Sequence, residues 1–488
     1  MKEKIFLLIS LMSCSFIFAQ NEIDALRYSQ QNVFGTAKFS SMGGSFGSLG
    51  GDFSSLSYNP AGIALYQNSE LSITPNITIS ETTSNSNGTK FTSNNIKGNL
   101  SNLGYVATSK NQNDKWKRIN MGIGWNQIAN YNNKFYTERQ NNQTSLAELF
   151  LEDANGVLIS NLNYWGAEPA FWSDLIDLEN NFIDTSTGLY AFDNGNYILN
   201  LDPSSNKTQS SSVNSTGEMG EYVFSIGTSY EEKVYFGATV GLPSINYYEN
   251  SIYSESNFSN DTNYSLNNFT YDQQFSAVGN GINLKLGTII RVGDNTKIGG
   301  AIHTPSYISI EENYSTSITT NWNSGDRYSE NSPIGYFNYQ ITTPWKIIAS
   351  LSTVLNKKYI ANIEIELTDY SFTQFYSDNY QFIEENRTIK DLYTTATNIK
   401  FGGEANLYPF KLRAGYSLYG SPYKNNPEFE MENYSGGAGI DFGSSFLDFS
   451  YTISKNKSEY YMYSPSTEAR TLINIDNHYF LVTLGFRY

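Results

Sequence analysis

The sequence predicts an all-β protein, a 14-stranded antiparallel transmembrane β-barrel with a short N-terminal hatch (plug) in its lumen. Three observations lead to this prediction. Segments with apolar residues at every second position recur from residue 69 to the C-terminus, and their connections alternate between short and long. Only 16% of the 488 residues are charged, whereas 15% are aromatic. This composition suits a wall that faces lipid on one side and water on the other.

The overall composition argues against several classes of protein. A net charge of −16 speaks against nucleic-acid binding, which needs a basic surface. The single cysteine, Cys14, allows no internal disulfide. No stretch is apolar for long enough to predict a transmembrane helix, so a membrane location requires a closed barrel. The two histidines, His303 and His478, fit no catalytic or metal-binding pattern, and we expect no enzyme activity, metal or cofactor.

Residues 1–19 are predicted to be a secretory signal peptide. Two lysines precede an apolar run that ends at Phe18, and Ala19 is a small residue at a suitable cleavage point. The alternative is a lipoprotein signal with Cys14 lipidated, but the apolar run continues past that cysteine. Export and a barrel together predict a location in the outer membrane.

Residues 20–68 are predicted to form the hatch. Between Gly35 and Gly62 this segment is rich in glycine and serine, and it ends in Asn-Pro-Ala-Gly. Glycine adopts backbone angles that other residues avoid, and Asn-Pro favours a turn. The segment therefore predicts a compact unit with many turns. Its candidate functional residues are Gly43, Gly44, Asp52, Asn59, Pro60, Ala61 and Gly62.

The barrel is predicted to occupy residues 69–488. Its strands should begin near residues 69, 98, 118, 219, 233, 269, 297, 334, 359, 397, 411, 431, 446 and 474. The long connections include Glu81–Lys97, Ser254–Asn268 and the longest, residues 137–219, whereas Glu231–Lys233 and Asn356–Lys358 are short. Such barrels have short periplasmic turns and longer outer loops. An even number of strands then places both termini, and with them the hatch, at the periplasmic mouth.

The last predicted strand ends on an aromatic residue. Apolar side chains occupy alternate positions from Phe480 to the C-terminal Tyr488. This ending resembles the signal that outer-membrane barrels present to the barrel assembly machinery. We therefore expect that machinery as a partner during biogenesis, and outer-membrane lipid around a monomeric barrel.

The longest loop contains two segments with helical periodicity, Ser145–Asp153 and Pro169–Asn181. Their apolar faces have two interpretations: they pack against each other over the mouth of the barrel, or they form a groove that receives a hydrophobic ligand. On the second interpretation the ligand-binding residues include Phe171, Trp172 and Leu175.

Four motifs in the predicted hatch resemble the N-terminal plug of FadL-type outer-membrane transporters: Gly35-Thr36-Ala37-Lys38, Met42-Gly43-Gly44, Leu49-Gly50-Gly51-Asp52 and Asn59-Pro60-Ala61-Gly62. The resemblance implies passive uptake of a hydrophobic small molecule, such as a long-chain fatty acid or an aromatic hydrocarbon. It implies a route from an outer groove to a pocket above the hatch, and then sideways through a gap in the barrel wall. No motif carries over a ligand-binding residue or locates the gap.

The polar faces of the predicted strands carry charges of both signs. Most simply, these charges form a salt-bridge lattice that fills the lumen and holds the hatch. Alternatively, one cation pairs with a ligand carboxylate, and Lys346 and Arg27 are the candidates. The lumenal charges are Lys285, Arg291, Lys346, Lys400, Arg413, Glu364, Glu366, Glu404 and Asp448.

A structural or adhesive outer-membrane barrel without a transport role is the alternative function, because the loops are long and rich in Asn, Ser and Tyr. A TonB-dependent receptor would need a much longer plug, and a general porin would lack the Asn-Pro-Ala motif of the hatch.

Overall fold

The computed structural model describes residues 22–488 except 33, 87, 111–114, 180–182, 185–188, 191–194, 260–264 and 464–469. The predicted signal peptide lies outside these residues. The helices are α1 (Glu22–Ser29), α2 (Ala37–Ser41), α3 (Ser55–Tyr58), η1 (Pro60–Leu65), α4 (Ala147–Ala154), η2 (Ile159–Asn161), α5 (Ala167–Trp172), η3 (Tyr370–Phe372), α6 (Ile383–Leu392) and η4 (Pro427–Phe429).

The strands that form the barrel wall are β1 (Glu70–Ser86), β2 (Thr89–Lys110), β3 (Trp116–Asn130), β4 (Asn133–Asn141), β9 (Asn206–Tyr230), β10 (Val234–Ser259), β11 (Leu266–Arg291), β12 (Thr296–His303), β13 (Tyr307–Trp322), β14 (Arg327–Asn331), β15 (Gly335–Thr342), β16 (Lys346–Leu355), β17 (Tyr359–Asp369), β18 (Gln374–Tyr376), β19 (Thr395–Leu407), β20 (Phe410–Tyr419), β21 (Met431–Asp441), β22 (Ser445–Tyr460) and β23 (Thr471–Arg487). Outside the wall lie β5 (Ile176–Leu178), β6 (Ile183–Asp184), β7 (Leu189–Tyr190) and β8 (Tyr197–Leu199).

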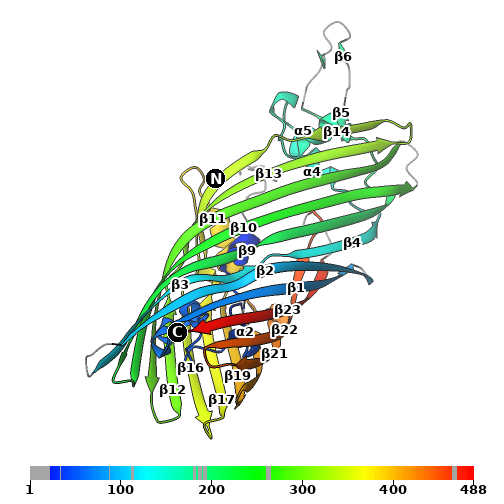
Figure 1. Cartoon of the computed structure of the whole chain (residues 1–488). Coiled ribbons are helices and arrows are strands. Elements are labelled where there is room, and N and C mark those ends of the chain that lie inside the picture. The colour runs from blue at the N-terminus through cyan, green and yellow to red at the C-terminus, as the bar shows by residue number, and fades with distance from the viewer. Residues whose placement is uncertain are drawn as a thin grey trace, which may run out of the picture.

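The wall closes on itself, because β1 pairs antiparallel with β2 on one side and with β23 on the other (Figure 1). The chain runs from one end of the wall to the other in 14 antiparallel crossings, which confirms the predicted fold class. Several crossings consist of more than one strand, such as β3 with β4. In two of them, β12 with β13 and β15 with β16, the ladder is interrupted at a proline. The breaks fall at Pro305 and Pro344. Proline has no backbone N–H to donate, so the hydrogen-bond ladder stops there.

Side chains alternate across the wall as the sequence predicts. On β1, the outward Leu71, Ile73 and Ile77 are exposed, whereas the inward side chains from Ser72 to Ser86 are buried. The other strands repeat this arrangement and give the outer face an apolar belt, as in barrels that span a bilayer. Among the described residues, no helix is long and apolar enough to cross a membrane.

The predicted loop Glu81–Lys97 is wrong. β1 and β2 remain paired through this stretch as far as Ser86 and Thr89, and β10 and β11 likewise extend through most of the predicted loop Ser254–Asn268. Outside the apolar belt both faces of a strand are polar, so the apolar alternation fades. The ladder continues nevertheless, because backbone pairing does not depend on apolar side chains.

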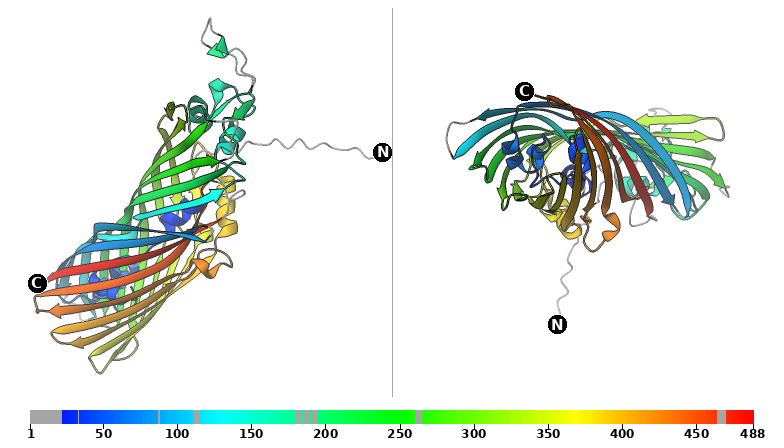
Figure 2. Two further views of the ribbon diagram at one scale, coloured as in Figure 1. Left: turned by 90° about the vertical axis from the view of Figure 1, so that its right-hand side faces the viewer. Right: turned by 60° about the horizontal axis from the view of Figure 1, so that its bottom comes forward.

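The hatch lies inside the lumen, at the end of the barrel with the short turns (Figure 2). At the other end, α4 and α5 pack against the ends of the wall strands β10, β11 and β13 (Figure 1). The helix predicted at Ser145–Asp153 is confirmed as α4. The second predicted helix is shorter than expected: α5 ends at Trp172, Asp174 adopts a positive φ of 58°, and Ile176–Leu178 forms a strand. A residue with left-handed backbone angles ends a helix.

Candidate functional site

The turns of the hatch depend on its glycines. Gly43 and Gly44 have φ angles of 64° and 69°, which favour glycine. A Cβ atom on Gly43 would lie 3.0 Å from the carbonyl oxygens of Phe401 and Tyr416. The Met42-Gly43-Gly44 turn therefore lies directly against β19 and β20.

Asp52 is buried and connects two segments of the hatch, so its carboxylate is not open to a ligand. Its Oδ2 accepts a hydrogen bond from the Thr36 hydroxyl at 2.7 Å, and its Oδ1 accepts one from the Ser54 backbone N–H at 2.9 Å. The Thr36 hydroxyl in turn caps α2, accepting from the Phe39 N–H at 3.1 Å. Asp52 thus connects the start of α2 to the start of α3.

Asn59 and Pro60 join the hatch to itself and to the wall. The Asn59 carboxamide accepts from the Ala61 N–H at 3.1 Å, which caps η1, and donates to the Gly47 carbonyl within the hatch. It also donates to the Thr288 carbonyl of β11 at 3.2 Å. Pro60 occupies the first turn of η1, where its missing N–H is not needed. Gly62 closes the unit, since its carbonyl accepts from the Gly51 N–H at 3.1 Å.

Three glycines of the wall, Gly227, Gly237 and Gly287, receive this part of the hatch. They are register partners on β9, β10 and β11, and we call them the glycine row. A Cβ atom would lie 2.4 Å from Ile63 Cγ2 at Gly227, 2.2 Å from the Pro60 carbonyl carbon at Gly237 and 1.9 Å from Asn59 Oδ1 at Gly287. Because the wall has no side chains at these three positions, the hatch can lie directly against its backbone.

We expect the double substitution Asn59→Ala with Pro60→Ala to loosen the hatch and leave the barrel folded. It removes a helix cap and a contact with the wall, which together are worth about 2 kcal/mol. Backbone amides of residues 36–66 should then exchange with solvent about 30-fold faster, by hydrogen-exchange mass spectrometry. The exposed Asn379→Ala is the control. Unchanged exchange would show that this motif does not hold the hatch.

A lattice of buried ion pairs surrounds the hatch, as the sequence predicts. Lys346 connects the lattice to the hatch, because its ammonium donates to the Gln31 side chain at 2.8 Å and also pairs with Glu366 of the wall. Glu364 accepts from the Gly47 N–H at 2.7 Å. The wall pairs are Lys285 with Glu221, Lys346 with Glu366 at 3.3 Å, Lys400 with Glu364 at 3.1 Å and with Glu366 at 2.9 Å, and Arg413 with Glu404 and Asp448 at 2.6 Å each.

Two further groups complete the lumenal contacts of the hatch. His303 faces the lumen, with Nε2 2.6 Å from the Tyr58 carbonyl oxygen. Burial raises the pKa of the Tyr58 phenol, which therefore stays protonated and donates to the Asn32 carbonyl at 3.0 Å. Arg291, in contrast, is exposed at the end of β11, and its guanidinium lies 3.5 Å from the Tyr235 hydroxyl. Among the described residues, no three His, Cys, Asp or Glu side chains are grouped to hold a metal.

A cavity of about 300 Å³ lies in the lumen between α1 and the wall. The predicted ligand-binding residue Arg27 lines it, but this guanidinium is paired with Asp24 and lies 4.3 Å from the centre of the Tyr247 ring. Lys346 forms an ion pair with Glu366. Of the two predicted cations, Arg27 therefore belongs to the hatch segment and Lys346 lies beside it, and both already have partners.

Beside this cavity the backbone pairing of the wall is interrupted between β2 and β3, and we call this interruption the seam. In the described register, β2 and β3 pair only as far as Asn102 and Asn126, and β3 has a register shift against β9 between Gln127 and Ala129. Ala129, Asn130 and Asn133 also line the cavity. Beyond the last pair, polar side chains connect the β1–β2 hairpin to β3 and β4: Asn76 to Gln127 at 3.0 Å, Asn130 to Thr78 at 3.2 Å and Thr82 to Asn133 at 2.8 Å.

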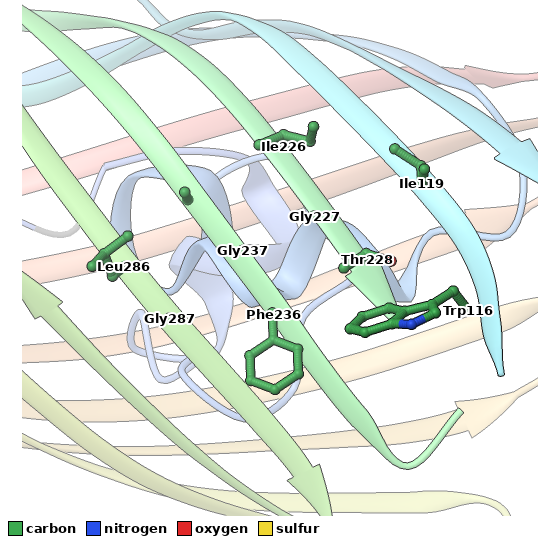
Figure 3. A pocket seen from close by; sticks show the side chains of 10 residues that line it. Trp116, Ile119, Ile226, Gly227, Thr228, Phe236, Gly237, Leu286 and Gly287 are labelled. Carbon is green, nitrogen blue, oxygen red and sulfur yellow. The ribbon is translucent and has the colours of Figure 1, made fainter. Parts of the chain in front are cut away.

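On the outer face of the wall, behind the glycine row, is an apolar hollow of about 650 Å³. Figure 3 shows its side chains on β3, β9, β10 and β11, with the hatch behind these strands. Since the glycines have no side chains, only backbone separates Asn59 and Pro60 from this lipid-facing hollow. Its rim consists of Trp116, Ile119, Ile226, Phe236 and Leu286.

The predicted loop residues lie far from the hatch. Phe171 and Leu175 are buried with Phe150 in one cluster that also includes Phe269 and Ile318 of the wall, whereas Trp172 is 47% exposed. The two helices therefore pack against each other and against the end of the barrel, as the first interpretation predicts. A ligand-binding role of Phe171, Trp172 and Leu175 stays a prediction.

Sequence reasoning missed the glycine row, the seam and Glu221. A signal existed for the first, because Gly237 and Gly287 occupy inward positions of their strands, where a side chain would normally fill the lumen. The seam has no such signal, since Asn and Gln are common on every inward face of this chain.

The sequence matches no protein-family model and no curated protein. The structure is similar to those of the Pseudomonas putida toluene transporter TodX (TM-score 0.53, 14% identity, 94% of this chain and 99% of that chain), a Pseudomonas aeruginosa FadL homologue (0.55, 10%, 94% and 99%) and the Ralstonia pickettii toluene transporter TbuX (0.51, 12%, 94% and 99%). These similarities cover both chains almost completely. The chain therefore has the fold of FadL-type transporters.

Proposed function

We propose that this protein, which has the fold of FadL-type transporters, is an outer-membrane channel for the passive uptake of hydrophobic or amphipathic small molecules. The observation that carries the proposal is the hatch: an N-terminal plug fixed in the lumen by the glycine row, with a cavity beside it. If no ligand passed the plug, its only effect would be to close the barrel. TodX and TbuX, which share the fold, are toluene transporters.

We further propose that the ligand leaves sideways through the seam. The cavity reaches Ala129 and Asn130, where the backbone pairing between β2 and β3 has ended. Side-chain hydrogen bonds between neutral groups hold the two edges together beyond that point, and each is worth only about 1 kcal/mol. Opening them would expose the cavity to the bilayer while the ladders of the other strands stay intact. An apolar ligand would then enter lipid without crossing periplasmic water.

Uptake of radiolabelled toluene and oleate by a deletion strain tests both proposals. Complementation with the wild-type protein should restore uptake at least fivefold over the empty vector. The pair Thr82→Cys with Asn133→Cys, cross-linked across the seam by a short bismaleimide, should return uptake to the background. The matched control is Ser225→Cys with Thr239→Cys, whose hydroxyls lie 2.6 Å apart on strands that are already paired. The mature chain has no other cysteine to react, because Cys14 lies in the predicted signal peptide.

The outcomes separate the two proposals. Equal uptake with and without the wild-type protein would contradict import and favour the structural or adhesive alternative. Restored uptake that the cross-linked seam leaves unchanged would contradict lateral exit alone.

A further inference from the structure

The lining of the lumenal cavity combines two kinds of surface. Part of it is apolar and aromatic, from α1, η3, the end of β20 and the segment that leads into β21: Leu26, Tyr370, Tyr419, Tyr423, Phe429 and Met431. The other part consists of carboxamides and hydroxyls, and β22 and β23 contribute Ser454, Asn456, Ser458 and Asn477 to it. Such a lining fits a ligand with an apolar body and a polar head.

The polar part of the lining has hydrogen-bonding capacity to offer. Asn398 is already engaged at both ends of its carboxamide, because its amide donates to Glu366 at 2.9 Å and its oxygen accepts from the Gly420 N–H at 3.1 Å. Asn456 differs: its Oδ1 is buried and accepts no hydrogen bond from any described residue. This oxygen is already shielded from water and lacks a hydrogen bond, which is unfavourable. Rotation of the carboxamide toward the cavity would let a ligand that donates a hydrogen bond satisfy it.

The described lining of the cavity offers an anionic head no buried positive charge without a partner. Among its described lining residues, Arg27 and Lys457 carry the positive charges. Arg27 is paired with Asp24 and stacked on Tyr247. Lys457 is 44% exposed, and its ammonium lies 3.9 Å from Glu428. A carboxylate in this cavity would lose its hydration without gaining a partner of opposite charge.

The inward face of β1 beside the cavity is also uncharged. From Ser72 to Ser86, every inward side chain of this strand is a hydroxyl or a carboxamide: Ser72, Thr74, Asn76, Thr78, Ser80, Thr82, Ser84 and Ser86. A ligand that moves along this strand meets neutral hydrogen-bonding groups throughout.

We propose that the ligand of this cavity is an apolar molecule with a neutral, hydrogen-bond-donating head, such as an alcohol or a phenol, rather than a carboxylate or a plain hydrocarbon. This inference rests on the proposed uptake function and names the substrate class of the same site. The head group donates to Asn456 and its neighbours on β22 and β23, while the apolar body contacts the aromatic part of the lining.

Native mass spectrometry of the purified protein with decanol, decanoate and decane at pH 8 tests the inference. These probes share one apolar body and differ in their heads. We expect decanol to occupy the protein at least fivefold more than either of the other two. Replacing Asn456 and Asn477 by leucine should abolish the preference of decanol over decane. Asn456→Lys should raise decanoate binding at least tenfold, and the exposed Asn379→Lys should not.

Each outcome has a defined meaning. Decanoate or decane binding as strongly as decanol to the wild-type protein would overturn the head-group inference and leave uptake standing. A preference that survives the double leucine substitution would overturn the assignment to β22 and β23. No binding of any probe would refute the cavity as a ligand site, and with it both this inference and the proposed function.

Discussion

Replacing Gly237 by valine is expected to expel the hatch from its seat and turn a plugged barrel into an open one. The new Cβ would lie 2.2 Å from the carbonyl carbon of Pro60, and a backbone atom of a tight turn has no rotamer with which to move away. Valine itself suits a strand, so the wall should still form. We expect single-channel conductance in planar bilayers to rise at least tenfold.

Gly300→Val is the matched control for this substitution. Gly300 lies on β12 of the same wall, but the nearest atom to its Cβ position is the Ile348 carbonyl oxygen, 3.8 Å away. This variant should conduct like the wild-type protein. If Gly237→Val conducts no more than the control while both run as folded barrels on unheated gels, the glycine row does not hold the plug.

Replacing Lys400 by methionine is expected to cause the largest loss of stability of any single lumenal substitution proposed here. Lys400 is fully buried, and its ammonium pairs with both Glu364 and Glu366. Its removal leaves buried carboxylates with fewer partners, which typically costs about 3–5 kcal/mol. Glu366 retains Lys346, so most of the loss should arise at Glu364. Urea titration in detergent, followed by tryptophan fluorescence, measures the change.

Two variants make this prediction specific. The double change Lys400→Met with Glu364→Gln should recover most of the lost stability, because Glu366 keeps Lys346 and no carboxylate is left without a partner. Arg387→Met breaks pairs whose side chains are about 70% exposed, and it should leave the midpoint unchanged. A single Lys400→Met variant as stable as the wild type would show that the lattice fills space without stabilising the barrel.

The number and order of the wall strands follow from the sequence because the wall has one lipid face. Leu71, Ile73 and Ile77 show the period of two wherever a strand crosses the belt. Outside the belt this constraint ends, and for that reason the extension of β1 and β2 to Ser86 and Thr89 was not predictable. The breaks at Pro305 and Pro344 depend on where each ladder would need an N–H, which is a property of the register.

The contents of the lumen are less accessible to sequence reasoning. The opposite charges of Lys400 and Glu364 predict an ion-pair lattice, but their partners depend on strand stagger. The hatch motif predicts a compact plug, yet its short helices are stabilised by contacts with the wall, as Asn59 and Thr288 show. The glycine row becomes evident only when Gly227, Gly237 and Gly287 are aligned by the register.

The start of α2 also touches the last strand of the barrel. The Ala37 N–H donates to the Thr483 hydroxyl at 2.7 Å across 446 residues of sequence, and the Phe34 ring packs edge-on against Tyr479 with ring centres 5.1 Å apart. Contacts this distant in sequence form late in folding. The contacts of Phe34 and Ala37 can therefore form only once β23 has joined the wall. Closure of β1 on β23 then completes the seat of the hatch, so that closing the barrel and docking its N-terminal segment are coupled.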